Sequence, residues 1–139
     1  MIEKRARPDA NKCFVCGPDN PAGLRLQFRI DGDVCRTEFT PGPLHCGYDS
    51  QTHGGILFSV LDDVMANWLF LQGLRAHTAR CSIRFRQPVA IGTPLQLEGR
   101  LLRRKGRLAV LEGRALRVSD GQLVADSEAT FMIVPDPPG

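Results

Sequence analysis

The sequence predicts an α+β domain in which an antiparallel sheet of about six strands wraps round one long central helix. Only one segment, from about Gly54 to Gln72, carries a strong helical pattern. Its apolar residues surround most of the helix instead of forming one stripe, which is typical of a helix enclosed by other elements. Most other segments alternate apolar with polar residues, as half-buried strands do, and short turns join several of them.

The N-terminal third is expected to contain a loop followed by a β-hairpin. Residues 1–12 are polar and are predicted to be flexible, whereas residues 13–23, CFVCGPDNPAG, have the composition of an ordered loop. Apolar and polar residues alternate over 24–30 and predict a strand. The Asp-Gly-Asp turn at 31–33 then leads into a second strand over 34–39.

The central region is expected to be a long loop that leads into the helix. Residues 40–52 contain Pro41, Gly42, Pro43 and Gly47, which favour irregular structure. The helix then follows, and Gly73 is a natural residue to end it.

The C-terminal half is expected to form four antiparallel strands. The first includes residues 81–86 and is stopped by Pro88, and the others cover residues 95–102, 108–118 and 123–134. Small side chains in the last two strands would let the helix approach the sheet closely; they are Ala109, Gly113, Ala115, Ala125, Ser127 and Ala129. We therefore expect one domain over residues 13–134 and a short tail over 135–139.

Composition and charge exclude several classes of protein. The chain has 139 residues, of which 42% are hydrophobic and 24% charged, so that disorder and coiled coil are disfavoured. The formal net charge of +3 does not call for a nucleic acid partner. Residues 75–117, however, contain eleven basic residues and only two acidic ones, which favours a small anionic partner.

The sequence also predicts a cytoplasmic location without contact with a membrane. The N-terminal residues MIEKRARPDANK lack the apolar run of a signal peptide. The five cysteines are an odd number and lack the spacing of a disulfide-bonded framework, which favours a reducing compartment. The longest apolar run, 56–72, carries Asp62, Asp63 and Asn67, which argues against a membrane span.

Two features at the start of the predicted helix favour catalysis on a carbonyl group. His53-Gly54-Gly55 opens the helix, where unpaired backbone N–H groups and the helix dipole can stabilise an oxyanion. The N–H of Gly54 is the expected donor, with that of Gly55 as a second candidate. Asp62 follows nine residues after His53 among mostly apolar helix neighbours, which would raise its pKa and suit a general base or nucleophile. A structural carboxylate is the alternative for Asp62.

This HGG motif, the Asp at that spacing and the strand order resemble the acyl-CoA thioesterases of the hotdog superfamily, in particular the PaaI-like group. The similarity covers about residues 13–134, and the segment CFVCGPDNPAGLRLQF resembles a loop found in some members. The resemblance implies a hotdog fold, hydrolysis of an acyl-CoA to a carboxylic acid and free CoA, and assembly into a dimer or tetramer. It implies no metal and no cofactor beyond the coenzyme A of the substrate.

The resemblance also implies roles for residues outside the motif. His53 would lie at the active site, and Thr78 would hold the catalytic acid or its water. Basic residues beside one hairpin turn would bind the phosphates of coenzyme A; they are Arg103, Arg104, Lys105 and Arg107. A loop histidine, a strand threonine and a solvated hairpin tip are the structural alternatives. The chain departs from many relatives at Gly47, where they carry Asn or Gln.

Helix geometry predicts that the active site is shared between two chains. Gly54 and Asp62 are eight residues apart, which separates them by about 12 Å along a helix. Both must reach the same reacting group, so one chain cannot supply both. Two antiparallel helices related by a twofold axis can bring Asp62 of one chain to the helix start of the other.

Two other functions and a metal site are alternatives. A hydratase or dehydratase acting on acyl thioesters usually carries its histidine in a different motif, and a non-catalytic acyl-CoA-binding module has no need of Asp62. A structural zinc site at Cys13-x-x-Cys16 would need two more ligands. The candidates to complete it are His45, Cys46 and Cys35, which come from separate segments, so that packed loop cysteines are expected instead.

Overall fold

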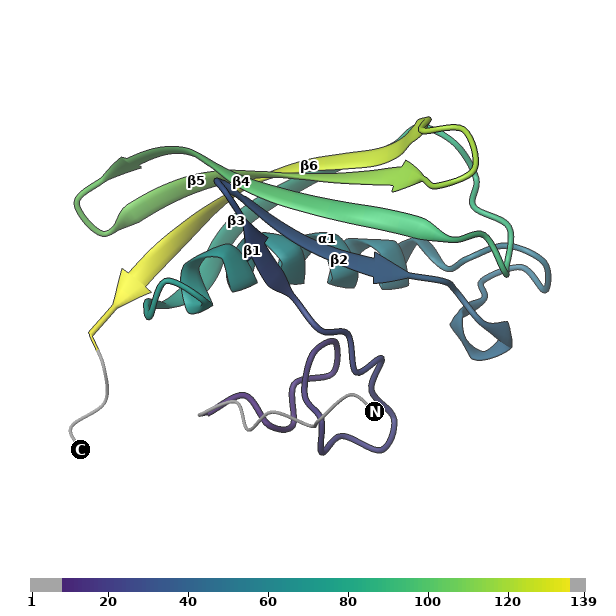
Figure 1. The fold of residues 1–139 in the computed structure, drawn as a ribbon, viewed down its shortest axis with the longest axis horizontal. Helices are drawn as coiled ribbons and strands as arrows, with labels where there is room; N and C mark the ends of the chain where they lie inside the picture. The colour runs from purple at the N-terminus through teal and green to yellow at the C-terminus, as the bar shows by residue number, and fades with distance from the viewer. Residues whose placement is uncertain (1–8, 136–139) are drawn as a thin grey trace.

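A computed structural model describes residues 9–135 of the chain as a six-stranded sheet and one long helix (Figure 1). The elements in chain order are β1 (Arg29–Asp31), β2 (Val34–Phe39), the 3-10 helix η1 (Pro43–His45), α1 (Gly54–Phe70), β3 (Arg75–Phe85), β4 (Leu95–Lys105), β5 (Leu108–Arg117) and β6 (Leu123–Val134). The predicted flexible segment 1–12 and tail 135–139 lie largely outside the described residues.

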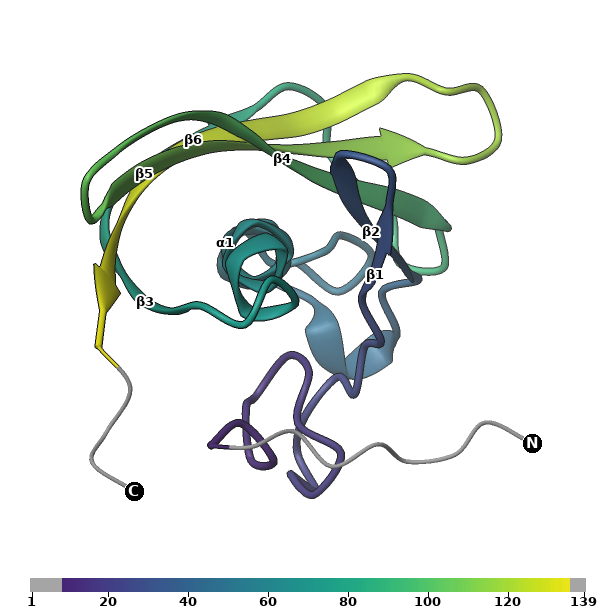
Figure 2. The same cartoon turned by 60° about the vertical axis from the view of Figure 1, so that its left-hand side comes forward.

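The sheet curves round the helix, as the sequence predicts. Its strand order is β1-β2-β4-β5-β6-β3, and every neighbouring pair is antiparallel. Viewed close to the helix axis, α1 lies in the hollow of the sheet, and the N-terminal loop lies on the side that the sheet leaves open (Figure 2). The predicted α+β class, with a sheet wrapped round one helix, is confirmed.

Glycine and alanine on the inner face of the sheet let α1 pack closely against it. A Cβ atom on Gly99 would lie 2.5 Å from the carbonyl oxygen of Val64, so this position in β4 tolerates no side chain. A Cβ atom on Gly113 would lie 3.3 Å from the carbonyl oxygen of Leu61. The predicted small-residue contact is confirmed, and Gly99 is a further contact of the same kind.

The core lies between this face of the sheet and the buried side of α1. The helix contributes Leu61, Val64 and Met65, each with no exposed surface, and the sheet contributes Leu97 and Phe131. Burying a side chain of this size contributes about 1.5–3 kcal/mol to folding.

Within residues 9–135, no helix has the length and apolar character needed to cross a bilayer.

The predicted strand over residues 24–30 is only partly correct. Regular pairing is confined to β1, because Leu24 and Leu26 donate their N–H groups to the carbonyls of Phe14 and Val15 in the N-terminal loop. Arg25 between them has a φ of 53°. The alternating apolar side chains of this segment do pack against the core, but its backbone hydrogen bonds go to the N-terminal loop instead of to a neighbouring strand.

The other boundaries move by a few residues. Helix α1 ends at Phe70, two residues before the predicted end, and Gly73 follows in the left-handed region with φ 81°. Strands β3 and β4 are longer than predicted because they extend into the polar residues 75–80 and 103–105. Neither segment shows a regular apolar alternation: Ala76 packs against the core, Thr78 donates to Asp62 on α1, and residues 103–105 are exposed.

Strand β3 forms one edge of the sheet and is exposed along most of its eleven residues. It pairs with β6, and the register shifts between Thr78 and Arg80, which marks a β-bulge. A bulge redirects nearby side chains. A long exposed edge strand is also a template for pairing with another chain.

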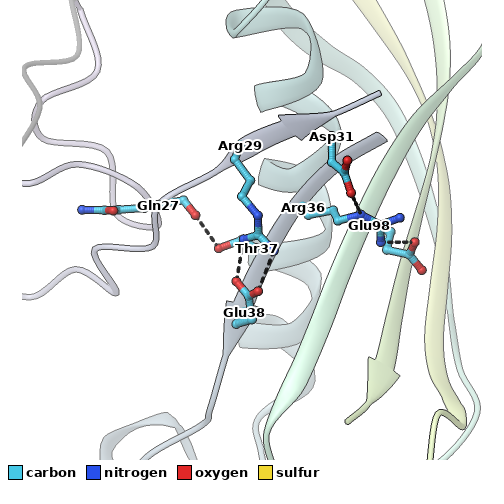
Figure 3. A network of polar contacts seen from close by, with 7 residues as sticks. All are labelled: Gln27, Arg29, Asp31, Arg36, Thr37, Glu38 and Glu98. Carbon is cyan, nitrogen blue, oxygen red and sulfur yellow. Dashed lines mark hydrogen bonds and ion pairs between the residues drawn. The ribbon is translucent and has the colours of Figure 1, made fainter. Parts of the chain in front are cut away.

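Polar side chains connect β1, β2 and β4 on the outer face of the sheet (Figure 3). Nη1 of Arg36 donates to Oε2 of Glu98 at 2.5 Å, and Nε of Arg36 donates to Asp31 at 3.1 Å. Arg29 and Glu38 form a second, bidentate pair with N···O distances of 2.7 and 2.8 Å. The two pairs differ mainly in exposure, since the Glu98 side chain is 11% exposed and that of Glu38 is 58% exposed.

This difference predicts unequal costs of removing the two glutamates. We expect Glu98→Ala to lower the free energy of unfolding by about 1–3 kcal/mol, because Arg36 is left half-buried without its main partner. The matched change Glu38→Ala breaks a solvent-exposed pair and should cost no more than about 1 kcal/mol. Urea denaturation of the two variants measures both values, and equal losses would contradict the expectation.

Candidate functional site

The start of α1 is organised by His53, which is the N-cap of the helix. Its Nδ1 accepts a hydrogen bond from the N–H of Gly55 at 2.8 Å. A neutral imidazole that accepts at Nδ1 carries its proton on Nε2. His53 is exposed, so this Nε2–H is available as a donor to a bound molecule.

Gly54 is the better oxyanion donor of the two glycines. Among residues 9–135 its N–H has no hydrogen-bond acceptor, whereas the N–H of Gly55 is engaged by His53. A Cβ atom on Gly54 would lie 3.4 Å from the ring of Phe85, which is 54% exposed on β3. The helix start therefore presents one unpaired N–H beside an accessible aromatic ring.

The loop before α1 is held against the N-cap by backbone hydrogen bonds. The N–H of His53 donates to the carbonyl of His45 at 2.8 Å, and that of Gly47 to the carbonyl of Gln51 at 2.9 Å. A side chain at Gly47 would begin 3.5 Å from Cα of His53, so this residue does lie beside the motif. The side-chain oxygens of Gln51 and Thr52 are buried and find no hydrogen-bond partner in the described part of the chain.

Asp62 is paired with Thr78 across the gap between α1 and β3. Oγ1 of Thr78 donates to Oδ1 of Asp62 at 2.8 Å. Thr78 lies at the β-bulge, and this local irregularity accompanies the orientation of its hydroxyl toward the helix. Burial raises the pKa of Asp62 above the usual range, and the hydrogen bond from Thr78 opposes that rise.

Cys81 belongs to the same neighbourhood, although no motif in the sequence points to it. Burial raises the pKa of its thiol, and the negative charge of Asp62 raises it further. The bulge between Thr78 and Arg80 shifts the strand register, so that simple alternation along β3 could not have placed Cys81 near Asp62.

The pair predicts a pH effect for Thr78. Thr78→Val removes the donor that lowers the pKa of Asp62, so this pKa should rise further and the acidic limb of the pH–activity profile should move to higher pH. We expect kcat/KM at neutral pH to fall about 3- to 10-fold, which corresponds to the free energy that one hydrogen bond contributes. Thr78→Ser keeps the hydroxyl and should keep the wild-type profile. A loss of activity in Thr78→Val without movement of the limb would contradict this role.

The two groups of site residues remain apart within one chain. His53, Gly54 and Gly55 lie at the start of α1, and Asp62 lies eight residues further along the same continuous helix, about 12 Å away along its axis. Asp62 and Thr78 therefore form one half of the predicted site, and the helix start forms the other.

The four basic residues lie at a third place. Arg103, Arg104 and Lys105 end β4, and Arg107 follows in the turn to β5; all four are exposed. Arg103 lies 4.0 Å from Glu128, and Arg104 donates to the carbonyl of Gly106 at 3.1 Å. Figure 1 shows this turn at the end of the molecule where α1 finishes, away from the start of the helix.

The model of the thioesterase superfamily matches residues 51–124, which include His53, Asp62 and Thr78. The chain belongs to the thioesterase superfamily. The predicted hotdog fold and the resemblance to the PaaI-like group are thereby confirmed, with support from the structural neighbours below.

A curated relative of this chain is named for a dehydratase activity and not for a thioesterase activity. The 3-hydroxyacyl-[acyl-carrier-protein] dehydratase FabZ of Oleidesulfovibrio alaskensis is 36% identical over 94 residues. The match covers 68% of this chain and 56% of the relative, so that the chain spans little more than half the length of that protein.

Three solved structures share the fold. A thioesterase superfamily protein is 28% identical with a TM-score of 0.77, over 85% of this chain and 61% of the other. The E. coli PaaI protein from the phenylacetic acid degradation operon is 21% identical with a TM-score of 0.74, over 81% of each chain. A hypothetical thioesterase of Streptococcus pneumoniae, solved with coenzyme A, is 16% identical with a TM-score of 0.74, over 81% of this chain and 91% of the other.

The pneumococcal protein has also been solved as two alanine variants. One replaces an aspartate and the other a threonine that follows it 16 residues later. Asp62 and Thr78 in this chain are separated by the same 16 residues.

Proposed function

We propose that this superfamily member hydrolyses an acyl-CoA to a carboxylic acid and free CoA. The observation that carries the proposal is the half-buried Asp62, with its raised pKa and its hydrogen bond of 2.8 Å from Thr78. A carboxylate held in this way is a suitable general base because its pKa is moved toward neutral pH. The matching aspartate–threonine spacing in the pneumococcal thioesterase supports the same pair.

The chemistry assigns one role to each group. Asp62 takes a proton from a water molecule as its oxygen forms a bond to the thioester carbon. The N–H of Gly54 donates to the oxyanion of the tetrahedral intermediate, and Nε2–H of His53 is placed to donate to the same substrate. The C–S bond then breaks, and the proton held by Asp62 returns to the departing thiolate. A direct attack by the carboxylate is the alternative for the first step.

The site is proposed to be formed by two chains. One helix cannot bring Gly54 and Asp62 within reach of one carbonyl, because about 12 Å of helix separates them. The exposed edge strand β3 carries Thr78 and offers a surface for twofold pairing with a second copy. In an antiparallel arrangement, the end of α1 in one chain approaches the start of α1 in the other. The basic turn, which carries Arg103, Arg104, Lys105 and Arg107, lies at the end of α1. The basic turn of the partner chain would therefore lie nearer to the helix start than the basic turn of the same chain does.

The basic turn is proposed to bind the phosphates of coenzyme A. The double variant Arg103→Ala/Arg104→Ala should raise KM for acyl-CoA about 3- to 10-fold at low salt and change kcat little, because these charges act far from the reacting carbonyl. The effect should shrink at high salt. The matched variant Arg25→Ala/Arg29→Ala removes two exposed charges elsewhere and should leave KM unchanged. Equal KM values for the two double variants would place the nucleotide site elsewhere.

A dehydratase acting on acyl thioesters is the second candidate, and the identity of 36% to FabZ favours it. Such a reaction also needs an acid–base pair and a polarised thioester carbonyl, and His53, Asp62 and the helix start could supply them. A binding module that holds acyl-CoA without turnover is the third candidate.

One assay separates these candidates. The protein is incubated with a panel of acyl-CoA and 2-enoyl-CoA thioesters, and both free thiol and loss of the enoyl absorbance are followed. Thiol release supports the proposed hydrolase, and loss of the enoyl absorbance without thiol release would replace it by a hydratase. Binding of acyl-CoA with neither signal would leave only the binding module.

A further inference from the structure

The N-terminal loop brings two cysteines against a helix face that the proposed chemistry does not use. Cys13 and Cys16 lie beside Asp63, and the two Sγ atoms and a carboxylate oxygen of Asp63 are all within 4.8 Å of one another. Sγ of Cys13 is 3.8 Å from Oδ1 and 3.9 Å from Oδ2 of Asp63. Asp63 follows Asp62 in sequence but points about 100° away from it round the helix. The cluster is therefore separate from the Asp62–Thr78 pair.

These distances suit ligands of one tetrahedral metal ion. Zinc–sulfur bonds of about 2.3 Å and zinc–oxygen bonds of about 2.0–2.2 Å place neighbouring ligand atoms roughly 3.5–3.8 Å apart. The contacts between Cys13 and Asp63 are close to that range, and small side-chain rotations bring the remaining atoms into it. Two sulfurs with one carboxylate favour zinc over magnesium or calcium, which prefer oxygen ligands.

A second observation is the set of hydrogen-bond donors round the cluster. Nδ2 of Asn67, a residue only 2% exposed, donates to Oδ2 of Asp63 at 2.9 Å and lies 3.9 Å from Sγ of Cys16. The N–H of Cys16 points to Sγ of Cys13 at 3.4 Å. Donors aimed at both sulfurs and at the carboxylate stabilise negatively charged ligands and fix their orientation, as outer-shell groups of metal sites do.

The cluster opens into a cavity of about 840 Å³ between the N-terminal loop, the end of α1 and the start of β3. Cys13, Cys16 and Asp63 line it together with Phe70 and His77, among others. A metal held by the three side chains would thus have room for a fourth ligand on the cavity side. Water or a small molecule with a donor atom could occupy that position.

We propose that Cys13, Cys16 and Asp63 bind a zinc-class divalent cation that ties the N-terminal loop to α1. The sequence predicts no metal here, because Cys35, Cys46 and His45, the other candidate ligands, come from separate segments. The structure offers Asp63 instead, 50 residues from Cys13. Nothing in the proposed thioester chemistry depends on this site, so either proposal can fail alone.

The test titrates the reduced, chelator-treated chain of 139 residues with metal ions. Calorimetry measures the binding of Zn²⁺, and the absorption of cobalt–thiolate bonds measures the binding of Co²⁺. We expect one ion per chain. Cys13→Ser and Cys16→Ser should each weaken the affinity at least 100-fold, and Asp63→Asn at least 10-fold. Cys46→Ser is the matched control and should leave the affinity unchanged.

A second measurement does not depend on whether the variants fold. Alkylation of the five cysteines of the wild-type chain, mapped by peptide mass spectrometry with and without Zn²⁺, should show protection of Cys13 and Cys16 by the metal. The proposal is overturned if the reduced chain binds no Zn²⁺, or if the metal leaves the reactivity of Cys13 and Cys16 unchanged. Formation of a disulfide between these two residues, with no metal affinity after its reduction, would also overturn it.

Discussion

Asp62→Asn is expected to lower the turnover of acyl-CoA about 10²- to 10⁴-fold, the usual effect of losing a general base. The amide keeps the size of the side chain and can still accept the hydrogen bond of 2.8 Å from Thr78, so the geometry should survive while the proton acceptor is lost. Steady-state thiol release measures the effect. Asp33→Asn makes the same chemical change in the β1–β2 turn and should leave turnover within about twofold. A loss below tenfold in folded Asp62→Asn would remove Asp62 from the reaction.

The same variant should also alter the pH dependence of stability. Because burial raises the pKa of Asp62 in the folded chain, the folded state binds more protons than the unfolded state over the range between the two pKa values. The contribution of Asp62 to stability should therefore fall through this range as the pH rises, and Asn cannot titrate. The stability of Asp62→Asn relative to wild type should increase as the pH rises above the ordinary aspartate pKa of 3.8, as urea denaturation at a series of pH values can show. A constant difference would contradict the raised pKa.

Gly54→Pro is expected to lower turnover about 10²- to 10³-fold, the usual cost of one lost oxyanion donor. Proline removes the backbone N–H and adds its ring carbons, and it is tolerated at the first position of a helix. His53 before it has φ −63° and ψ 131°, a conformation that a following proline accepts. Gly54→Ala keeps the N–H while adding the same Cβ atom 3.4 Å from Phe85, and it should lose less than about tenfold. Equal losses in the two variants would show that bulk beside Phe85, and not the donor, accounts for the effect.

The two inactive variants together test the shared site. When Asp62→Asn and Gly54→Pro chains exchange subunits at equal amounts, half of the dimers are mixed. Each mixed dimer has one site with both changes and one with neither, so about a quarter of wild-type activity should return. Failure to recover activity, with mixed dimers verified by native mass spectrometry, would place the site within one chain.

Local pattern was sufficient for the fold class and for most elements. The enclosed helix, the strands β2 and β6 and the small residues that meet the helix were all predictable, because burial imposes a period on the residues that pack against the core. The alternation over 24–30 reports burial against the core correctly, but it does not form a strand over its whole length, because the backbone of Leu24 and Leu26 bonds to the N-terminal loop. The start of β3 and the end of β4 could not be placed because residues 75–80 and 103–105 are mostly polar and show no regular apolar alternation.

By itself the sequence determined the start of α1, the position of Asp62 on that helix and the separation of Asp62 from Gly54, since each depends on residues close together in the chain. Only the tertiary structure decided which residues from other segments meet them. The hydroxyl of Thr78 reaches Asp62 at a bulge, and Cys13 and Cys16 meet Asp63 through a loop that folds back on the helix. Such contacts depend on how the sheet curves and where the loop packs, and these are properties of the whole core that no short stretch of sequence specifies.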